Sequence, residues 1–319
     1  MEDKWDRIIS QCNFNVKNKY RARGAWLLDT DTGLKLLQDQ NEAGAHFEFS
    51  NRVKECLTQG GMPLIDRAVM HGETSQGEKY VVYDWFRGEE CDWRKERELV
   101  LAVKTLARLH KIGETILTQE EGACPSDLTG EMDRHNRELK RIYTYMKNKK
   151  KQNEFERFAI TCFPEFYEDG KIALEMTQQL DYYINTKDKV TSICHGDYNY
   201  HNVLFTSKGV ALTHFDKLAI DRPVMDLYYF MRKSLEKNNW DMEKGKAMIE
   251  GYIKERPLEK GEYQLLALLF LYPEKYWKVL NQYYNKKKSW MSARSIEKLI
   301  EIREQYSARK DFINLMQNL

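Results

Sequence analysis

Apolar and polar positions over the first part of the chain predict a small sheet with one helix. Residues 23–38 carry two apolar runs on either side of a polar turn that ends in Gly33, which is typical of a β-hairpin. Residues 43–61 instead have the spacing of an amphipathic helix and end in two glycines, a common helix stop. Residues 63–70 and 79–86 are two further apolar runs joined by a polar turn. The predicted order is therefore hairpin, helix, hairpin.

The chain after this point is predicted to be mostly helical. Five residues recur on one stripe of a helix: Leu99, Val103, Leu106, Leu109 and His110. Residues 132–158 are rich in charge and predict one exposed helix, whose basic stretch 147–151 is expected to be a solvated helix end rather than an anion site. The exception is 190–215, where short β-rich runs surround a polar cluster. The aromatic residues of the last third are expected in the core; among them are Trp277, Tyr283, Tyr284 and Trp290.

Composition narrows the possible partners and the compartment. The 319 residues carry 51 Lys and Arg against 49 Asp and Glu, so a formal charge of +2 gives no reason to expect nucleic acid or an anionic membrane as the partner. Six cysteines are scattered without a C-x-x-C pair, which fits a reducing cytoplasm better than a zinc site or a disulfide framework. The N-terminus lacks an apolar leader, and the most apolar run, 265–272, is too short to span a bilayer. These features predict a soluble protein made inside the cell.

Candidate chemistry is concentrated in residues 193–227. His195-Gly196-Asp197 is followed five residues later by Asn202. Phosphoryl transfer needs a carboxylate to orient or deprotonate the attacking hydroxyl, and Asp197 is the candidate for that role. The reaction also needs oxygen ligands for Mg²⁺, and Asn202 can supply one of them.

A single H-G-D sequence is more often a turn than a site, so the order of features decides the interpretation. Six follow one another here: H-G-D, an asparagine, an apolar triplet, a glycine turn at 208–209, a second apolar strand and D-x-P-x-x-D-L. The last of these is commonly a structural brace, and Asp226 is expected to be structural. A chance match of all six is improbable.

This pattern resembles the aminoglycoside phosphotransferase and choline kinase group of kinase-like folds. Within that group it is most similar to the CotS family of spore coat proteins. The resemblance extends over nearly the whole chain, and the segment most specific to the coat family is YPEKYWKVLNQYYNKKKSW. The matching segments are residues 24–37, 84–90, 106–110, 195–204, 220–233 and 272–290.

The resemblance implies an α+β, two-lobed protein kinase-like fold. A small antiparallel-sheet lobe with one helix would comprise residues 1–86, and a larger, mainly helical lobe would comprise 87–319 and hold the catalytic-loop-like segment 193–227. It also implies ATP and Mg²⁺ as possible cofactors, with Asp84 and Phe86 beside the nucleotide. The family further implies synthesis in the cytoplasm of the sporulating mother cell and deposition on the spore coat. The implied partners are other coat proteins, and a nucleotide or small polyol is a possible ligand of the interlobe cleft.

The sequence departs from the family pattern at the metal position. In active relatives the strand after the catalytic loop ends in an acid-aromatic-acid motif, whose first aspartate holds Mg²⁺. Aligning Thr213–Lys217 on that motif places His214 at the metal position and Asp216 at the second acid. Imidazole is a poor Mg²⁺ ligand, because this ion prefers hard oxygen donors. On a regular strand Asp216 would lie on the same side as His214 but about 7 Å further along.

A second departure concerns the phosphate-binding lysine of the family. Counting along the strand from Gly33 places Gln38 at that position, and glutamine cannot neutralise phosphate. Lys35 is three residues earlier and is expected on the opposite face of the strand. Glu48 matches the carboxylate partner of the missing lysine, so the family's salt bridge would become at best a hydrogen bond.

Together these departures favour a degenerate kinase, a pseudokinase that acts structurally or as a binding module of the spore coat. One alternative is an active ATP-dependent small-molecule phosphotransferase that acts on a hydroxyl group, with Asp197 as base and Asn202 and Asp216 on the metal. Another is a module that holds a nucleotide or polyol without Mg²⁺, with protonated His214 donating to a phosphate.

Overall fold

The computed structural model describes residues 4–22, 24–40, 44–116, 127–180, 191–285 and 293–317. The chain divides into two compact units. The first unit comprises Met1–Glu121 and Ser192–Ala219, and the second comprises Gly122–Thr191 and Ile220–Leu319. The predicted boundary at residue 86 separates the sheet from all that follows it, whereas contacts in the structure group the first long helix and the His195 loop with the sheet.

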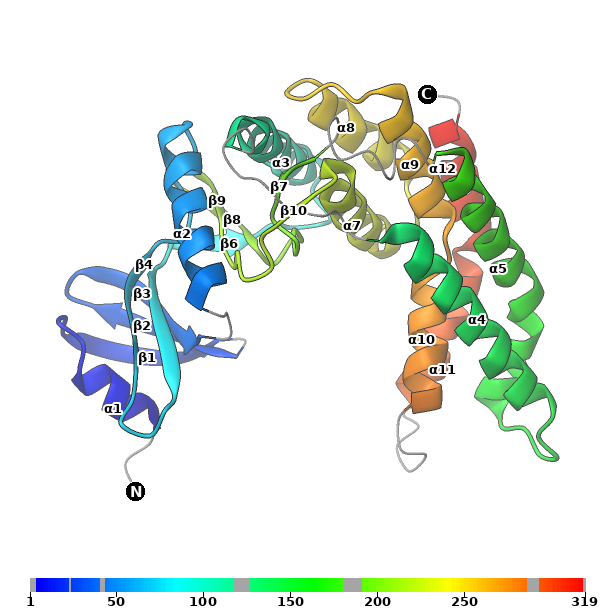
Figure 1. Cartoon of the computed structure of the whole chain (residues 1–319), viewed down its shortest axis with the longest axis horizontal. Helices are drawn as coiled ribbons and strands as arrows, with labels where there is room; N and C mark the ends of the chain where they lie inside the picture. Colours follow the sequence, from blue (N-terminus) through cyan, green and yellow to red (C-terminus); the bar gives the residue numbers. More distant parts are fainter. Residues whose placement is uncertain are drawn as a thin grey trace. The chain divides into compact units, whose positions relative to one another are not determined.

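The first unit is built on a five-stranded antiparallel sheet with the strand order β1-β2-β3-β5-β4 (Figure 1). Two helices accompany this sheet, one before β1 and one between β3 and β4. The elements are α1 (Lys4–Ser10), β1 (Val16–Ala22), β2 (Ala25–Thr30), β3 (Gly33–Asp39), α2 (Gly44–Gln59), β4 (Ala68–Glu73) and β5 (Lys79–Asp84). The predicted order of hairpin, helix and hairpin is present as β2-β3, α2 and β4-β5, whereas α1 and β1 were not predicted.

The two faces of this sheet bury different clusters. On one face Leu28, Leu37 and Val82 pack with Ile8 of α1. On the other face Leu36, Val81 and Tyr83 pack with Phe47 of α2. Because side chains alternate along a strand, Gln38 lies on the α2 face with Leu36, and Lys35 lies on the α1 face with Leu37.

The rest of the first unit carries the H-G-D segment. It contains β6 (Gly88–Glu90), α3 (Glu96–Ile116), β7 (Ser192–Cys194), β8 (Val203–Thr206) and β9 (Gly209–Leu212). Strands β8 and β9 form the predicted hairpin, in which Thr206 pairs with Gly209, and β6 adds to its other edge. The stripe expected on α3 is fully buried. Gly113 allows α3 to approach β7, because a Cβ there would lie 2.9 Å from the Ile193 nitrogen.

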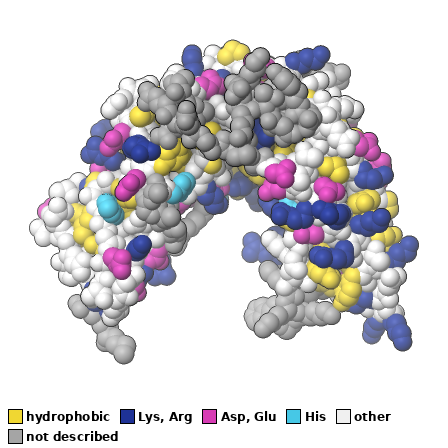
Figure 2. Space-filling view, in the orientation of Figure 1, with side chains coloured by type: hydrophobic (Ala, Val, Ile, Leu, Met, Phe, Trp, Pro, Cys, Tyr) yellow, Lys and Arg dark blue, Asp and Glu magenta, His cyan; other side chains and the backbone are white. Residues whose placement is uncertain are grey.

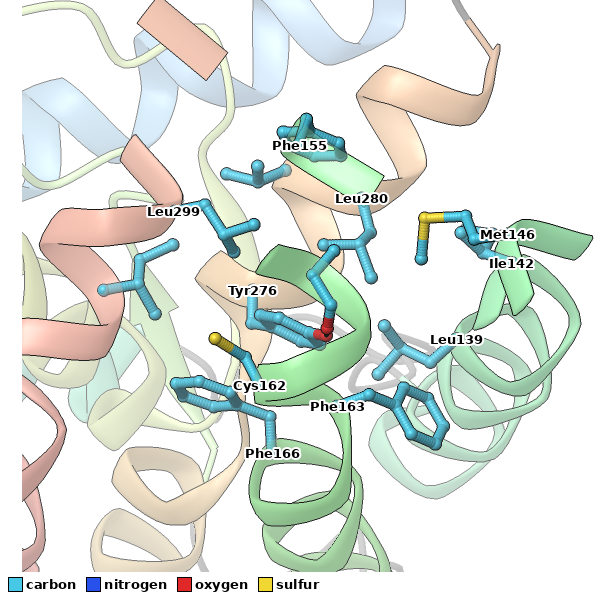
Figure 3. Close-up of a cluster of buried hydrophobic side chains, with 13 residues drawn as sticks. Leu139, Ile142, Met146, Phe155, Cys162, Phe163, Phe166, Tyr276, Leu280 and Leu299 are labelled. Carbon is cyan, nitrogen blue, oxygen red and sulfur yellow. Dashed lines mark hydrogen bonds between the residues drawn. The ribbon is translucent and has the colours of Figure 1, made fainter. Parts of the chain in front are cut away.

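The second unit is mainly helical. Its helices are α4 (Leu128–Lys147), α5 (Glu154–Gln179), α7 (Pro223–Lys237), α8 (Met242–Ile253), α9 (Lys260–Leu271), α10 (Glu274–Asn285), α11 (Ala293–Glu304) and α12 (Tyr306–Gln317). The short strand β10 (Ala219–Asp221) lies at the boundary of the two units. Figure 3 shows the core where α4, α5, α10 and α11 meet, which includes Phe166 and Tyr276. Their rings stack with centroids 4.5 Å apart.

The charged faces of these helices are mixed in sign. Figure 2 shows Lys and Arg side chains interspersed with Asp and Glu side chains over the second unit. Local ion pairs account for part of this pattern, such as Arg137 with Asp133 at 3.0 Å and Lys171 with Glu168 at 2.6 Å. The surface therefore resembles an ordinary solvated helical face.

The single helix predicted over 132–158 is wrong. The structure ends α4 at Lys147 and begins α5 at Glu154. Asn153 and Glu156 form a capping box, in which each side chain accepts from the other residue's backbone N–H. This reciprocal cap satisfies two N–H groups that a helix start leaves unpaired, so it favours a new helix at this point.

The cysteines of the described ranges are all free thiols: Cys12, Cys56, Cys91, Cys162 and Cys194. Burial, with smaller contributions from Glu98 and Asp92, raises the pKa of the Cys91 thiol to about 12, so it stays protonated at neutral pH. Cys124 and Trp290 lie outside the described residues. Within the described ranges, no helix is both long and apolar enough to cross a membrane.

Candidate active site

The H-G-D loop is held by a buried histidine. His195 is fully buried, and its Nε2 donates to the Thr213 carbonyl at 3.0 Å. Its Nδ1 accepts from the Asp197 backbone N–H at 3.3 Å, so the ring is neutral with its proton on Nε2. Gly196 has φ of 76°, and a Cβ there would lie 1.8 Å from the Lys217 carbonyl oxygen. Glycine is therefore required where this loop meets residues 213–217.

Asp197, the predicted base, already accepts hydrogen bonds at both carboxylate oxygens. Asn199 Nδ2 donates to its Oδ1 at 3.0 Å, and Lys217 Nζ lies 3.2 Å from its Oδ2. Asn202 Nδ2 donates to the Asp197 carbonyl at 2.9 Å. Because the amide nitrogen of Asn202 is used in this way, its Oδ1 is the atom that could bind a metal. The structure thus brings Asp197 and Asn202 together as predicted.

His214 lies in a turn rather than in a strand. Strand β9 ends at Leu212, and His214 has φ of 63°, in the left-handed region. Its backbone N–H donates to Asp66 Oδ2 at 2.8 Å, and its ring lies edge-on to Trp85 with the centroids 5.3 Å apart. The expectation that His214 and Asp216 share one side of a regular strand is therefore wrong, because the left-handed residue redirects the chain.

Gln38 and Asp216 lie close together across the first unit. Gln38 Nε2 is 3.5 Å from Asp216 Oδ1, at the outer limit of a hydrogen bond. Lys35 is on the other face of β3, as expected, and is paired with Asp84. Asp84 is the last residue of β5, and the half-buried Phe86 follows two residues later.

The expected contact between Gln38 and Glu48 is not formed within the described residues. Glu48 is exposed and lines an open groove of about 610 Å³ with His71 and Lys79. The buried polar side chains of α2 are instead Ser50 and Lys54. Phe47 faces the sheet, and Ser50 and Lys54 follow it at helical spacing on the same side of α2. Glu48 is rotated away from that side.

Four residues that sequence reasoning missed also contribute to this site: Lys54, Asp66, Trp85 and Lys217. A signal existed for Lys54, which lies seven residues after Phe47 on the inward stripe of α2. Asp66, Trp85 and Lys217 gave no periodic signal, since they lie in turns and at a strand end.

Comparison with known proteins decides the family. The profile of the family described as "Spore coat putative kinase YutH" matches residues 45–316. The chain belongs to this family. Spore coat protein S of Bacillus subtilis (strain 168) is 20% identical over 318 residues, which covers 93% of this chain and 90% of that protein. The resemblance to spore coat proteins predicted from the sequence is confirmed.

Solved structures similar to this coat-family chain confirm the kinase-like α+β fold. An aminoglycoside phosphotransferase from Alicyclobacillus acidocaldarius has a TM-score of 0.87 at 17% identity, covering 97% of this chain and 94% of that one. Spectinomycin phosphotransferase APH(9)-Ia, in complex with ADP and spectinomycin, has a TM-score of 0.64 at 12% identity, covering 96% and 93%. Amicoumacin kinase hAmiN, in complex with AMP-PNP and Ca²⁺, has a TM-score of 0.58 at 12% identity, covering 93% and 87%.

The donors of this coat-family chain do not fit Mg²⁺. The ion needs near-octahedral oxygen ligands, and here the turn beside Asn202 offers the imidazole of His214 and the carboxylate of Asp216. The Asp216 carboxylate also accepts from Gln38. One carboxylate, one amide oxygen and an imidazole form a weak set of donors for a hard cation.

Proposed function

We propose that this chain is a spore coat protein with a degenerate kinase site, which does not transfer phosphate and acts through contacts with other coat components. Its family is named for the spore coat, and the related Spore coat protein S carries the same assignment in its name. The chain is made in the mother-cell cytoplasm and then joins the coat. Other coat proteins are its partners.

His214 is the observation that carries this proposal. It stands two residues before Asp216, beside the loop of Asp197 and Asn202, where the kinase-like pattern calls for a metal carboxylate. Phosphoryl transfer depends almost entirely on positioning and on electrostatic stabilisation by cations. An imidazole in place of the carboxylate removes the main anchor for the metal ion.

Two contacts of neighbouring residues support the same conclusion. Gln38 supplies no positive charge for a phosphate, and its amide lies beside Asp216. Lys217 and Asn199 already donate to the two carboxylate oxygens of Asp197. A catalytic base would offer these oxygens to the acceptor hydroxyl.

The arrangement of Asn202 favours a second candidate, an active small-molecule kinase that phosphorylates a hydroxyl group. Its Nδ2 donates to the Asp197 carbonyl, so Oδ1 is the atom that would bind a metal. ATP with Mg²⁺ would then be the cofactor, and the similar structures of spectinomycin phosphotransferase and amicoumacin kinase contain ADP and AMP-PNP.

An ATP turnover assay separates the two candidates. Purified protein with ATP, Mg²⁺ and a panel of small alcohols is expected to release no ADP above the level of Asp197→Asn. Loss of Asp197 should cost several orders of magnitude in any real phosphotransfer, because it removes the group that orients the nucleophile. Turnover by the wild-type chain that disappears in Asp197→Asn would establish the active kinase instead.

A further inference from the structure

A buried ion pair links α2 to the loop before β4. Lys54 Nζ lies 2.9 Å from Asp66 Oδ1, and the two side chains are only 5% and 2% exposed. Lysine and aspartate are rarely buried so completely without a specific partner, since removing each charge from water is costly. The pair is therefore a positioned feature of the fold rather than a surface contact.

Asp66 connects this pair to the candidate active site. Its second oxygen, Oδ2, accepts the His214 backbone N–H at 2.8 Å, and its own N–H donates to the Leu212 carbonyl at 3.1 Å. Hydrogen bonds to a charged acceptor are stronger than neutral ones. One carboxylate thus holds both α2 and the left-handed turn at His214.

Lys54 also contacts the aromatic residue of the metal-site motif. Its ammonium group lies 5.3 Å from the ring centroid of Phe215 and 4.6 Å from that of Tyr83. A desolvated cation over aromatic rings adds attraction to each contact. Asp66 consequently holds the backbone of His214, and Lys54 of α2 contacts the side chain of Phe215.

We propose that Lys54 and Asp66 form a built-in brace that fixes α2 and the His214 turn without nucleotide or metal. In the family pattern an ion pair between a lysine of β3 and a carboxylate of α2 would connect this helix to the site. In this chain the residues at those two positions are Gln38 and Glu48. In the brace α2 supplies the cation instead of the carboxylate, and the carboxylate comes from the loop before β4. The inference does not depend on whether the site transfers phosphate.

The brace is expected to fix the geometry of the His214 turn rather than to add to the stability of the fold. Replacing a buried ion pair by apolar residues of similar volume often leaves stability unchanged, whereas removing one partner is strongly destabilising. Lys54→Met/Asp66→Leu should therefore fold while lacking the acceptor of the His214 N–H. The chain has seven histidines, so protein labelled with ¹⁵N-histidine gives a simple spectrum in which the His214 amide can be followed.

In this double variant the His214 amide is expected to shift and to exchange with solvent roughly tenfold faster or more, because its charge-assisted hydrogen bond is lost. The matched control is Lys4→Met/Asp39→Asn, which removes an ion pair linking α1 to β3 of the same unit. It should leave the His214 amide unchanged. A folded Lys54→Met/Asp66→Leu protein with wild-type exchange at His214 would overturn the brace.

A measurement on the wild-type chain provides an independent test if the double variant does not fold. The His214 amide is expected to be protected in ligand-free protein containing EDTA, and to keep that protection when ATP and Mg²⁺ are added. An amide that exchanges freely without ligand and becomes protected only with Mg²⁺ and ATP would show that ligand, not the ion pair, orders the turn.

Discussion

Replacing His214 with aspartate and Gln38 with lysine is expected to make the chain bind ATP, in the presence of Mg²⁺, at least roughly tenfold more tightly. The aspartate adds a carboxylate beside Asp216 and Asn202, which gives the site the hard oxygen donors that Mg²⁺ prefers. Aspartate tolerates the left-handed backbone at position 214, where φ is 63°, so the substitution adds little strain. A lysine at position 38 would face Asp216, since Gln38 already lies 3.5 Å from it, and would offer a positive charge for a phosphate.

The matched control for this gain is His214→Asn/Gln38→Met. Asparagine also accepts the left-handed conformation but adds no charge, and methionine keeps the length of residue 38 without a cation. Calorimetric titration should show the gain for the charged pair of substitutions and not for the neutral pair. Equal affinities for both double variants would mean that His214 and Gln38 do not limit metal and nucleotide binding.

Phe166→Ala is expected to lower the free energy of unfolding of the second unit by about 3–5 kcal/mol. The Phe166 side chain is 1% exposed and stacks on Tyr276 (Figure 3), and it meets Tyr306 edge-on with the ring centroids 5.1 Å apart. Truncation removes these contacts and leaves a cavity that the surrounding helices cannot fill completely. Hydrogen exchange of α5 amides measures the loss within this unit, which avoids treating a two-unit chain as a single cooperative transition.

Ile172→Ala provides the control on the same helix. Ile172 is 38% exposed, so its truncation should cost about 1 kcal/mol or less. A similar small effect for Phe166→Ala would show that the cluster around Tyr276 is not the main core of these helices. Since Tyr276 belongs to the segment that most resembles coat proteins, the same measurement shows whether that segment has a structural role.

The sequence predicted those parts of the fold that carry clear apolar runs or stripes. Strands β2, β3 and β5 bury side chains on both faces of the sheet, helices α2 and α3 each bury one stripe, and all five were predicted. Strand β1 exposes nearly every side chain, so it has no alternation to detect. The break between α4 and α5 depends on one reciprocal cap at Asn153, which is a weaker signal than the charge-rich periodicity on either side.

The candidate site was predictable where its residues are close in sequence. Asp197 and Asn202 lie on one short loop, and strand alternation placed Gln38 and Lys35 on opposite faces. Contacts between distant segments could not be derived in the same way. The pairing of Lys54 with Asp66 depends on the rotation of α2 about its axis, and Glu48, which was matched to the carboxylate of the family pattern, is exposed.

The most direct test of the degenerate site is calorimetric titration of the wild-type chain with ATP, carried out with Mg²⁺ and again with EDTA. The His214 imidazole, Gln38 and the occupied carboxylate of Asp197 predict that Mg²⁺ adds no affinity, so the two titrations should agree. Micromolar binding that appears only with Mg²⁺ would contradict this account, because it would require a working metal site built from Asp216 and Asn202.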